Sequence, residues 1–151
     1  MVERSIVHGS FTVERTYRHS PATVFSAWAK PEFKRQWFGS PEEGNTEHIF
    51  EFRVGGREFN QGKVGDDTYT FDVRYQDIVE ANRIIYTYEM KLNGERISVS
   101  VASVELRPEA EGTRMIVRED GVFLDGLDTV KQREDGTNYL IDQLGQWLDR
   151  Q

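Results

Sequence analysis

The side chains best suited to chemistry are aromatic residues that alternate along two strand-like stretches. Tyr69 and Phe71 in the first stretch, and Tyr86, Tyr88 and Met90 in the second, fall two residues apart. A period of two places such residues on one face of a β-sheet. Aromatic rings stack against flat or lipidic molecules, and tyrosine hydroxyls hydrogen-bond to their polar groups. The same rings also fill protein cores, so the pattern indicates either a ligand pocket or an aromatic core.

The three histidines form no recognisable catalytic or metal-binding pattern. His8 lies near the N-terminus, His19 in an expected turn and His48 in an expected strand. Their spacing indicates neither a metal triad nor a nucleophile relay. The chain has no cysteine, so thiolate metal sites and cysteine nucleophiles are excluded. The sequence therefore predicts no metal and no cofactor, and it identifies no catalytic residue.

Four charged residues lie on or beside expected strands. Arg15, Arg57, Glu89 and Glu119 either orient the polar group of a ligand inside a pocket or form exposed ion pairs. Of these, Arg57 is the candidate that we group with the tyrosine hydroxyls as a ligand-orienting residue.

Composition restricts the class of protein. The chain has 151 residues, of which 37% are hydrophobic, and this length suits one domain with one core. We expect residues 1–151 to form a single domain with a polar lead over residues 1–9. The net charge of −7 opposes binding to nucleic acid or to anionic lipid. We expect no signal peptide and no membrane span, and the lack of cysteine favours a cytoplasmic location.

Two short helices are expected after the first strand. Residues 11–18 alternate in the manner of a strand with one buried face. A helix is predicted from Pro21, because proline is well tolerated in the first turn of a helix. A second helix is predicted over residues 31–38, and it ends at two helix breakers, Gly39 and Pro41.

From residue 46 onward the chain reads as antiparallel strands separated by turn residues. The expected strands cover residues 46–52, 57–61, 69–75, 84–90, 96–106 and 113–119. Asn93-Gly94 is a strong signal for a two-residue hairpin. Gly55-Gly56 is a second pair that can turn the chain back on itself.

Two local irregularities are also predicted. In strand 96–106, apolar residues occupy one set of alternating positions first and the other set later, which indicates a bulge near Val101 or Ala102. The last two dozen residues carry apolar side chains at steps of three and four and form an amphipathic helix. Gly136 lies inside this helix, where it indicates a kink or a close approach to the sheet.

Four stretches of the chain resemble a known family. They are VERTYRHSPATVFSAWAKPEFKRQWFG, FRVGG, GTRMIVRED and GVFLDGLD. They are similar to the domain related to the C-terminal part of the activator of the ninety-kilodalton heat-shock protein's ATPase, over most of the chain from about Phe11 to Leu148. This family belongs to the START-like, helix-grip superfamily of polyketide cyclases, lipid-transfer domains and plant pathogenesis proteins.

The resemblance implies a fold and the place of a cavity. The fold is α+β, of the helix-grip (START/Bet v 1-like) type, with six to seven antiparallel strands curved around the long C-terminal helix. A cavity between sheet and helix would be lined by the alternating aromatic residues. The resemblance places Trp37, Phe38 and Phe123 at its entrance, and Tyr139 of the long helix is a further candidate for its wall.

Three functions remain open on the sequence alone. The first is a domain that binds a small apolar, aromatic or lipid-like molecule without a defined reaction. The second, implied by the resemblance, is a co-chaperone-like module that contacts a chaperone and regulates its ATPase. The third is an enzyme of the cyclase, hydrolase or dehydratase type. The sequence leaves open whether the chain forms a homodimer.

Overall fold

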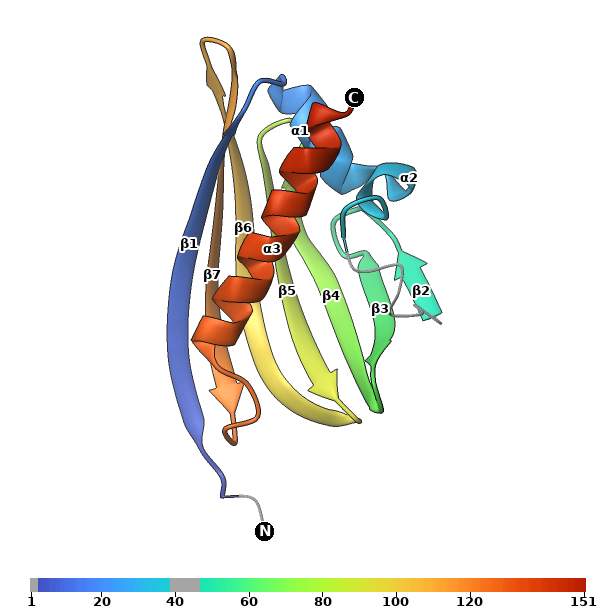
Figure 1. Cartoon of the computed structure of the whole chain (residues 1–151), viewed down its shortest axis with the longest axis vertical. Coiled ribbons are helices and arrows are strands. Elements are labelled where there is room, and N and C mark those ends of the chain that lie inside the picture. The colour runs from blue at the N-terminus through green and yellow to red at the C-terminus, as the bar shows by residue number, and fades with distance from the viewer. Residues whose placement is uncertain (1–2, 39–46) are drawn as a thin grey trace.

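In a computed structural model of the chain, one curved antiparallel sheet surrounds a long helix (Figure 1). The structure describes residues 3–38 and 47–151. The elements are β1 (Ile6–Tyr17), α1 (Pro21–Ala29), α2 (Pro31–Lys34), β2 (Glu47–Phe50), β3 (Arg57–Val64), β4 (Asp67–Val79), β5 (Arg83–Leu92), β6 (Glu95–Glu109), β7 (Gly112–Leu124) and α3 (Val130–Asp149). The helix breakers at Gly39 and Pro41 and the expected strand start at Thr46 lie outside the described residues.

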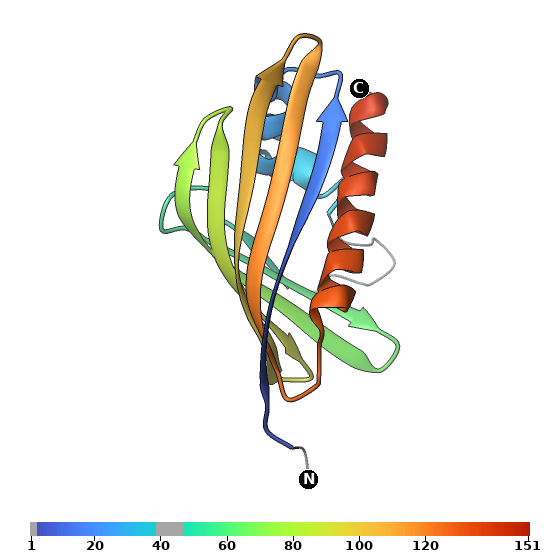
Figure 2. The same ribbon diagram turned by 90° about the vertical axis from the view of Figure 1, so that its left-hand side faces the viewer.

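The seven strands follow the order β1-β7-β6-β5-β4-β3-β2. Strands that are adjacent in the sheet are also consecutive in the sequence, with one exception: β1 pairs with the last strand, β7. The helix α3 runs along the concave side of the sheet, and α1 and α2 lie beside its C-terminal end (Figures 1 and 2). This arrangement confirms the expected α+β helix-grip fold.

The C-terminal half of α3 is held by apolar packing. Leu144, Trp147 and Leu148 are buried in the main core, and the ring of Trp147 lies 5.2 Å from that of Phe33 in α2. Each such side chain contributes about 1.5–3 kcal/mol when fully buried. The helix begins after Thr129, whose hydroxyl accepts a hydrogen bond from the backbone N–H of Gln132, as an N-cap residue does.

The first short helix matches its prediction and the second does not. Ser20 caps α1 by accepting a hydrogen bond from the Thr23 backbone N–H. The helix α2 ends at Lys34, so Trp37 and Phe38 lie beyond it rather than inside it. Trp37 instead turns inward, where its indole N–H donates to the Ala27 carbonyl oxygen over 3.0 Å. The backbone N–H groups of Trp37 and Phe38 still bond to the Lys34 carbonyl oxygen, so the chain continues in turns beyond α2, and the indole bond fastens these turns to α1.

The lead expected over residues 1–9 is shorter than predicted. The strand β1 begins at Ile6, and residues 6–9 pair with β7 as far as Leu124. Ile6 and Val7 are exposed, so no alternation between buried and exposed positions marks this end of the strand. Backbone pairing with β7 extends β1 here without a side-chain signal.

The bulge predicted near Val101 or Ala102 is wrong. The register of β6 against β5 shifts between Met90 and Lys91, where Ile97 is the extra residue. Beyond Ile97 the inward positions begin with Ser98 and continue through Ala102 to Leu106. Two of these inward residues are serines, Ser98 and Ser100, which concealed the true inward phase.

A buried ion pair fastens α2 to the sheet. The Lys34 ammonium lies 2.6 Å from a Glu58 carboxylate oxygen, and the two side chains are 10% and 1% exposed. The Tyr75 hydroxyl also donates to Glu58, and Asn60 donates to its other oxygen over 2.9 Å. The ammonium also lies 4.6 Å from the centre of the Phe38 ring. Charges this deeply buried need their partners.

Replacing Lys34 tests this fastening. Lys34→Met leaves the Glu58 carboxylate buried without its cation and should lower the unfolding free energy by about 3 kcal/mol. The double variant Lys34→Met, Glu58→Gln should recover part of that loss. The control is Lys91→Met, whose more exposed pair with Glu89 should cost less than about 1 kcal/mol. Equal urea midpoints for the two single variants would contradict the prediction.

Candidate functional site

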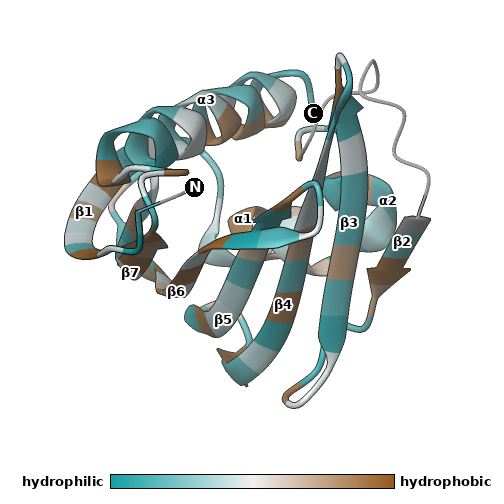
Figure 3. Ribbon diagram, turned by 90° about the horizontal axis from the view of Figure 1, so that it is seen from below, coloured by the Kyte–Doolittle hydropathy of each residue, from teal (hydrophilic) through white to brown (hydrophobic). Residues whose placement is uncertain are grey.

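A cavity of about 560 Å³ lies between α3 and the sheet. Viewed from below, α3 lies over β1 and β7, and the sheet curves through β5 and β4 to β3 (Figure 3). Residues from α1, α3, β3, β4, β5 and β7, together with Trp37 and Phe38, line the cavity. Pockets of roughly 300–1,000 Å³ bind drug-sized molecules. The volume therefore suits an organic ligand.

The exposure of the wall residues shows where the cavity opens. Val64 at the end of β3 and Tyr139 of α3 are 55% and 59% exposed, and Gly136 of α3 is also exposed. A Cβ added at Gly136 would meet no atom within 4 Å, so the close approach predicted at this glycine is wrong. Trp37, by contrast, is 1% exposed. The mouth therefore lies between α3 and the β3–β4 hairpin, not at Trp37.

Most of the ligand-binding candidates singled out in the sequence lie on the cavity wall. They are Trp37, Phe38, Tyr69, Phe71, Tyr86, Tyr88, Met90 and Tyr139. Contact of these residues with a ligand stays a prediction.

Arg57 and Phe123 lie elsewhere than expected. Arg57 makes two hydrogen bonds of 2.9 Å to the Asp72 carboxylate and is not among the cavity residues. Its neighbour Glu58 is buried instead. Phe123 is buried beneath the guanidinium of Arg133. Phe123 therefore supports the anchor of α3 and does not form an entrance.

Within the described part of the chain, Glu119 is the carboxyl group on the cavity wall. It extends from β7 and is 5% exposed. One of its oxygens accepts a hydrogen bond from the Tyr88 hydroxyl, and the other accepts a longer one, 3.4 Å, from the Thr137 hydroxyl. Burial raises the pKa of Glu119, although Tyr88, Arg133 and Thr137 act in the opposite direction. The sequence identified Glu119 as a candidate, but not its partners.

Arg133 anchors the N-terminal half of α3 to the sheet. Its guanidinium donates to the Tyr88 hydroxyl and to the Ser98 hydroxyl, each over 3.0 Å, and it also pairs with Asp128. Burial disfavours the charge of Arg133, but Tyr88, Asp128 and Glu119 outweigh this effect and raise its pKa. The sequence analysis did not identify Arg133 or Thr137, because the spacing of apolar residues gives no information about polar residues on the inner side of a helix.

Two polar groups on buried residues of the wall have no hydrogen-bond partner within the described residues. The Trp28 indole N–H is buried and unpaired, although its ring packs on Trp37. The Tyr86 hydroxyl likewise makes no hydrogen bond to the described part of the chain. Burial, and then the neighbouring Glu119, raise the pKa of Tyr86, so its hydroxyl keeps its proton and remains a donor.

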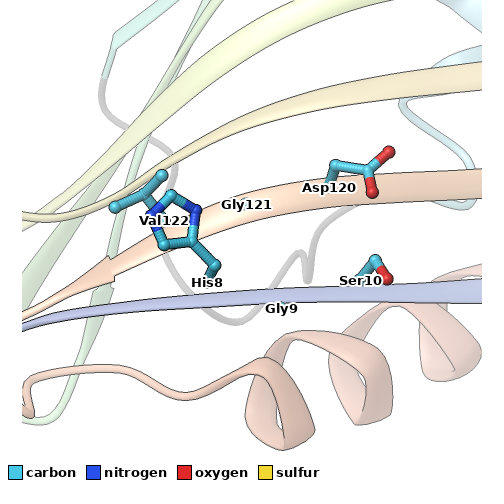
Figure 4. A pocket seen from close by; sticks show the side chains of 6 residues that line it. All are labelled: His8, Gly9, Ser10, Asp120, Gly121 and Val122. Carbon is cyan, nitrogen blue, oxygen red and sulfur yellow. The ribbon is translucent and has the colours of Figure 1, made fainter.

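A second hollow, of about 380 Å³, lies on the other face of the sheet. His8 and Ser10 of β1 and Asp120 of β7 point away from α3 around it (Figure 4). All three residues are exposed, and the Asp120 carboxylate accepts from Arg118 of its own strand. These residues form no catalytic relay, because no hydrogen bond joins them among the described residues.

Comparison with known proteins establishes the family. Residues 18–149 match the family model of the activator of Hsp90 ATPase homolog 1-like proteins. The chain belongs to this AHSA1 family. A search of the curated proteins found no match.

Several solved structures are similar to this protein over nearly the whole chain. An uncharacterised protein from Rhizobium leguminosarum is 40% identical, with a TM-score of 0.93 and coverage of 99% of both chains. A protein from Rhizobium loti is 39% identical, with a TM-score of 0.89 and coverage of 95% of this chain and 99% of the other. An AHSA1-like protein from Aeromonas hydrophila shares the fold at 18% identity, with a TM-score of 0.69 over 94% of this chain and 93% of the other.

Two further structural findings concern the described residues alone. Among them, no His, Asp and Glu side chains form a group of three placed to hold a metal ion. None of their helices has the length and apolar character to cross a membrane.

Two tyrosine substitutions test which hydroxyls of the aromatic face are engaged. Tyr75→Phe removes a donor to the buried Glu58 carboxylate and should lower the unfolding free energy by about 1.5–3 kcal/mol. Tyr86→Phe removes a hydroxyl that no described residue bonds, so we expect a change below about 0.5 kcal/mol. Urea unfolding measures both. Similar losses for the two variants would show that Tyr86 has a protein partner.

The raised pKa of Glu119 predicts a pH dependence of stability. The unfolded chain loses the Glu119 proton near the ordinary pKa of 4.5, whereas the folded protein keeps this proton to a higher pH. The stability that the folded protein gains from this proton is complete below that pH, and it is lost as the pH rises through the raised pKa. The stability of the wild type relative to Glu119→Gln should therefore fall as pH rises above about 4.5. A difference that stays constant, or that grows with pH, would refute the assignment.

Proposed function

We propose that this AHSA1 domain binds a small, largely apolar or aromatic molecule in the cavity between α3 and the sheet. The observation that carries the proposal is the cavity itself, with a volume of about 560 Å³. Its mouth is flanked by exposed residues, and its deep wall consists mainly of buried rings. Burial of the ligand's apolar surface would supply most of the affinity.

The contacts of Glu119 favour binding over catalysis. A catalytic acid or base must reach the substrate with an available proton or lone pair and a suitable partner. Both Glu119 oxygens accept hydrogen bonds from the protein, which fix the orientation of the carboxyl group. These contacts hold Glu119 in the place of a ligand-orienting group, and they are the basis on which we put binding before a cyclase or hydrolase reaction.

A chaperone interaction is the second candidate function, and the family description favours it. That description names homologues of an activator of the Hsp90 ATPase. Such a partner, and the cytoplasmic location expected from the sequence, remain proposals for this chain. Recovery of a chaperone with the purified domain, at an affinity unaffected by blocking the cavity, would favour this function over ligand binding.

Blocking the mouth tests the ligand-binding proposal. Thermal unfolding is followed with a library of uncharged aromatic and lipid-like molecules. A ligand present at a hundred times its dissociation constant adds about 2.7 kcal/mol, which raises the melting temperature by roughly 5–10 °C for a domain of this size. Gly136→Trp places a large ring at the mouth, where space is open, and should abolish the shift.

Gly136→Ala is the matched control for this experiment. Alanine is favoured over glycine inside a helix by up to about 1 kcal/mol, so this variant should be slightly more stable and keep the ligand shift. If no library member shifts the wild type, or if Gly136→Trp responds as the wild type does, binding in this cavity is refuted.

A further inference from the structure

Resting on the proposed function, we infer that the ligand carries an uncharged hydroxyl group, which donates a hydrogen bond to Glu119 and accepts one from Tyr86. The site therefore discriminates against ligands with a carboxylate at that position, such as fatty acids and aromatic acids. The inference depends on strand register, on unused hydrogen-bonding capacity and on the charge of the cavity wall.

The register of three strands places Tyr86 and Glu119 on either side of a small residue. Tyr86 of β5 pairs with Ala102 of β6, and Ala102 pairs with Glu119 of β7. Neighbouring strands lie about 4.8 Å apart, so the backbones of Tyr86 and Glu119 are separated by roughly 10 Å. Only the methyl group of Ala102 stands between these two longer side chains, and both of them line the cavity. We therefore place the polar group of the ligand between these two side chains.

Both residues have capacity for a further hydrogen bond. A carboxylate offers about four lone-pair positions, and Glu119 uses one for Tyr88 and one for the long 3.4 Å contact with Thr137. The Tyr86 hydroxyl donates to no described residue. A ligand hydroxyl satisfies both at once, because it donates through its hydrogen and accepts through its oxygen. A carboxylate group can accept from Tyr86, but it has no proton for Glu119.

Charge on the wall also opposes an anionic ligand. Arg133 is the cation on the cavity wall among the described residues, and it already pairs with Asp128, as well as bonding Tyr88 and Ser98. Glu119 is therefore the negative group without a full positive partner. Like charges held close together in a poorly solvated site repel strongly. A ligand carboxylate beside Glu119 would force one of the two groups to hold a proton, as two adjacent carboxylates do, and this proton uptake costs binding free energy near neutral pH.

The test uses four probes that share one flat apolar body: pyrene, hydroxypyrene, pyrene carboxylate and pyrenemethylammonium. Dissociation constants are measured by probe fluorescence near neutral pH. In the wild type, hydroxypyrene should bind at least about tenfold more tightly than pyrene carboxylate, which corresponds to one hydrogen bond to a charged group. Equal or tighter binding of the carboxylate overturns the inference. So does tenfold tighter binding of the ammonium, which would make Glu119 a cation site.

Three variants assign the effect to individual residues. Tyr86→Phe should weaken hydroxypyrene several-fold, in line with one neutral hydrogen bond, and leave pyrene unchanged. Glu119→Gln should reduce the ratio of the dissociation constants of pyrene carboxylate and hydroxypyrene to less than about threefold, because the repelling charge is removed. Glu89→Gln is the control, since Glu89 pairs with Arg96 outside the cavity, and it should behave as the wild type.

The outcomes separate this inference from the proposed function. If none of the four probes binds and no library member shifts the melting temperature, capture of apolar molecules fails and the proposed function fails with it. If pyrene binds but the wild type does not prefer the hydroxyl, only the hydroxyl inference fails. Should Glu119→Gln not fold, the wild-type preference and the response of Tyr86→Phe decide the matter.

Discussion

The helix α3 is held to the sheet in two different ways, and the cavity exists because of this difference. Its C-terminal half buries Leu144 and Leu148 in a close-packed core, where interdigitating side chains leave little space. Its N-terminal half is anchored by the hydrogen bonds of Arg133 to Tyr88 and Ser98. Such an anchor fixes the helix without filling the space beneath it, and Gly136 in the next turn contributes no side chain. The protein is therefore packed at one end of α3 and open at the other.

Polar groups inside the concave face follow from the same arrangement. A buried carboxylate is tolerated only where donors surround it. Glu58 has Lys34, Tyr75 and Asn60 around it, and these contacts tie α2 to β3 and β4. Glu119 has a weaker set of donors and borders the cavity. The first carboxylate is thus part of the scaffold, and the second remains able to respond to whatever enters the cavity.

The fold could be predicted from the sequence, but the polar details of the site could not. Alternating aromatic residues on β4 and β5 marked the face that lines the cavity, because apolar alternation reports burial directly. Inward polar residues gave no such signal. Ser98 and Ser100 concealed the inward phase of β6. Glu58, the buried neighbour of the candidate Arg57, is a charged residue whose burial the apolar pattern did not reveal. Arg133 was missed because the helical pattern was read from apolar residues alone.

The central claim is that the space between the anchored half of α3 and the sheet is a ligand site and not a part of the core. A crystal structure of the protein grown with hydroxypyrene tests this most directly. The account predicts the probe between α3 and strands β3 to β5, with its hydroxyl oxygen within hydrogen-bond distance of both Tyr86 and Glu119. A structure in which Phe71, Tyr139 and their neighbours close over that space, with the probe absent or bound elsewhere, would contradict it.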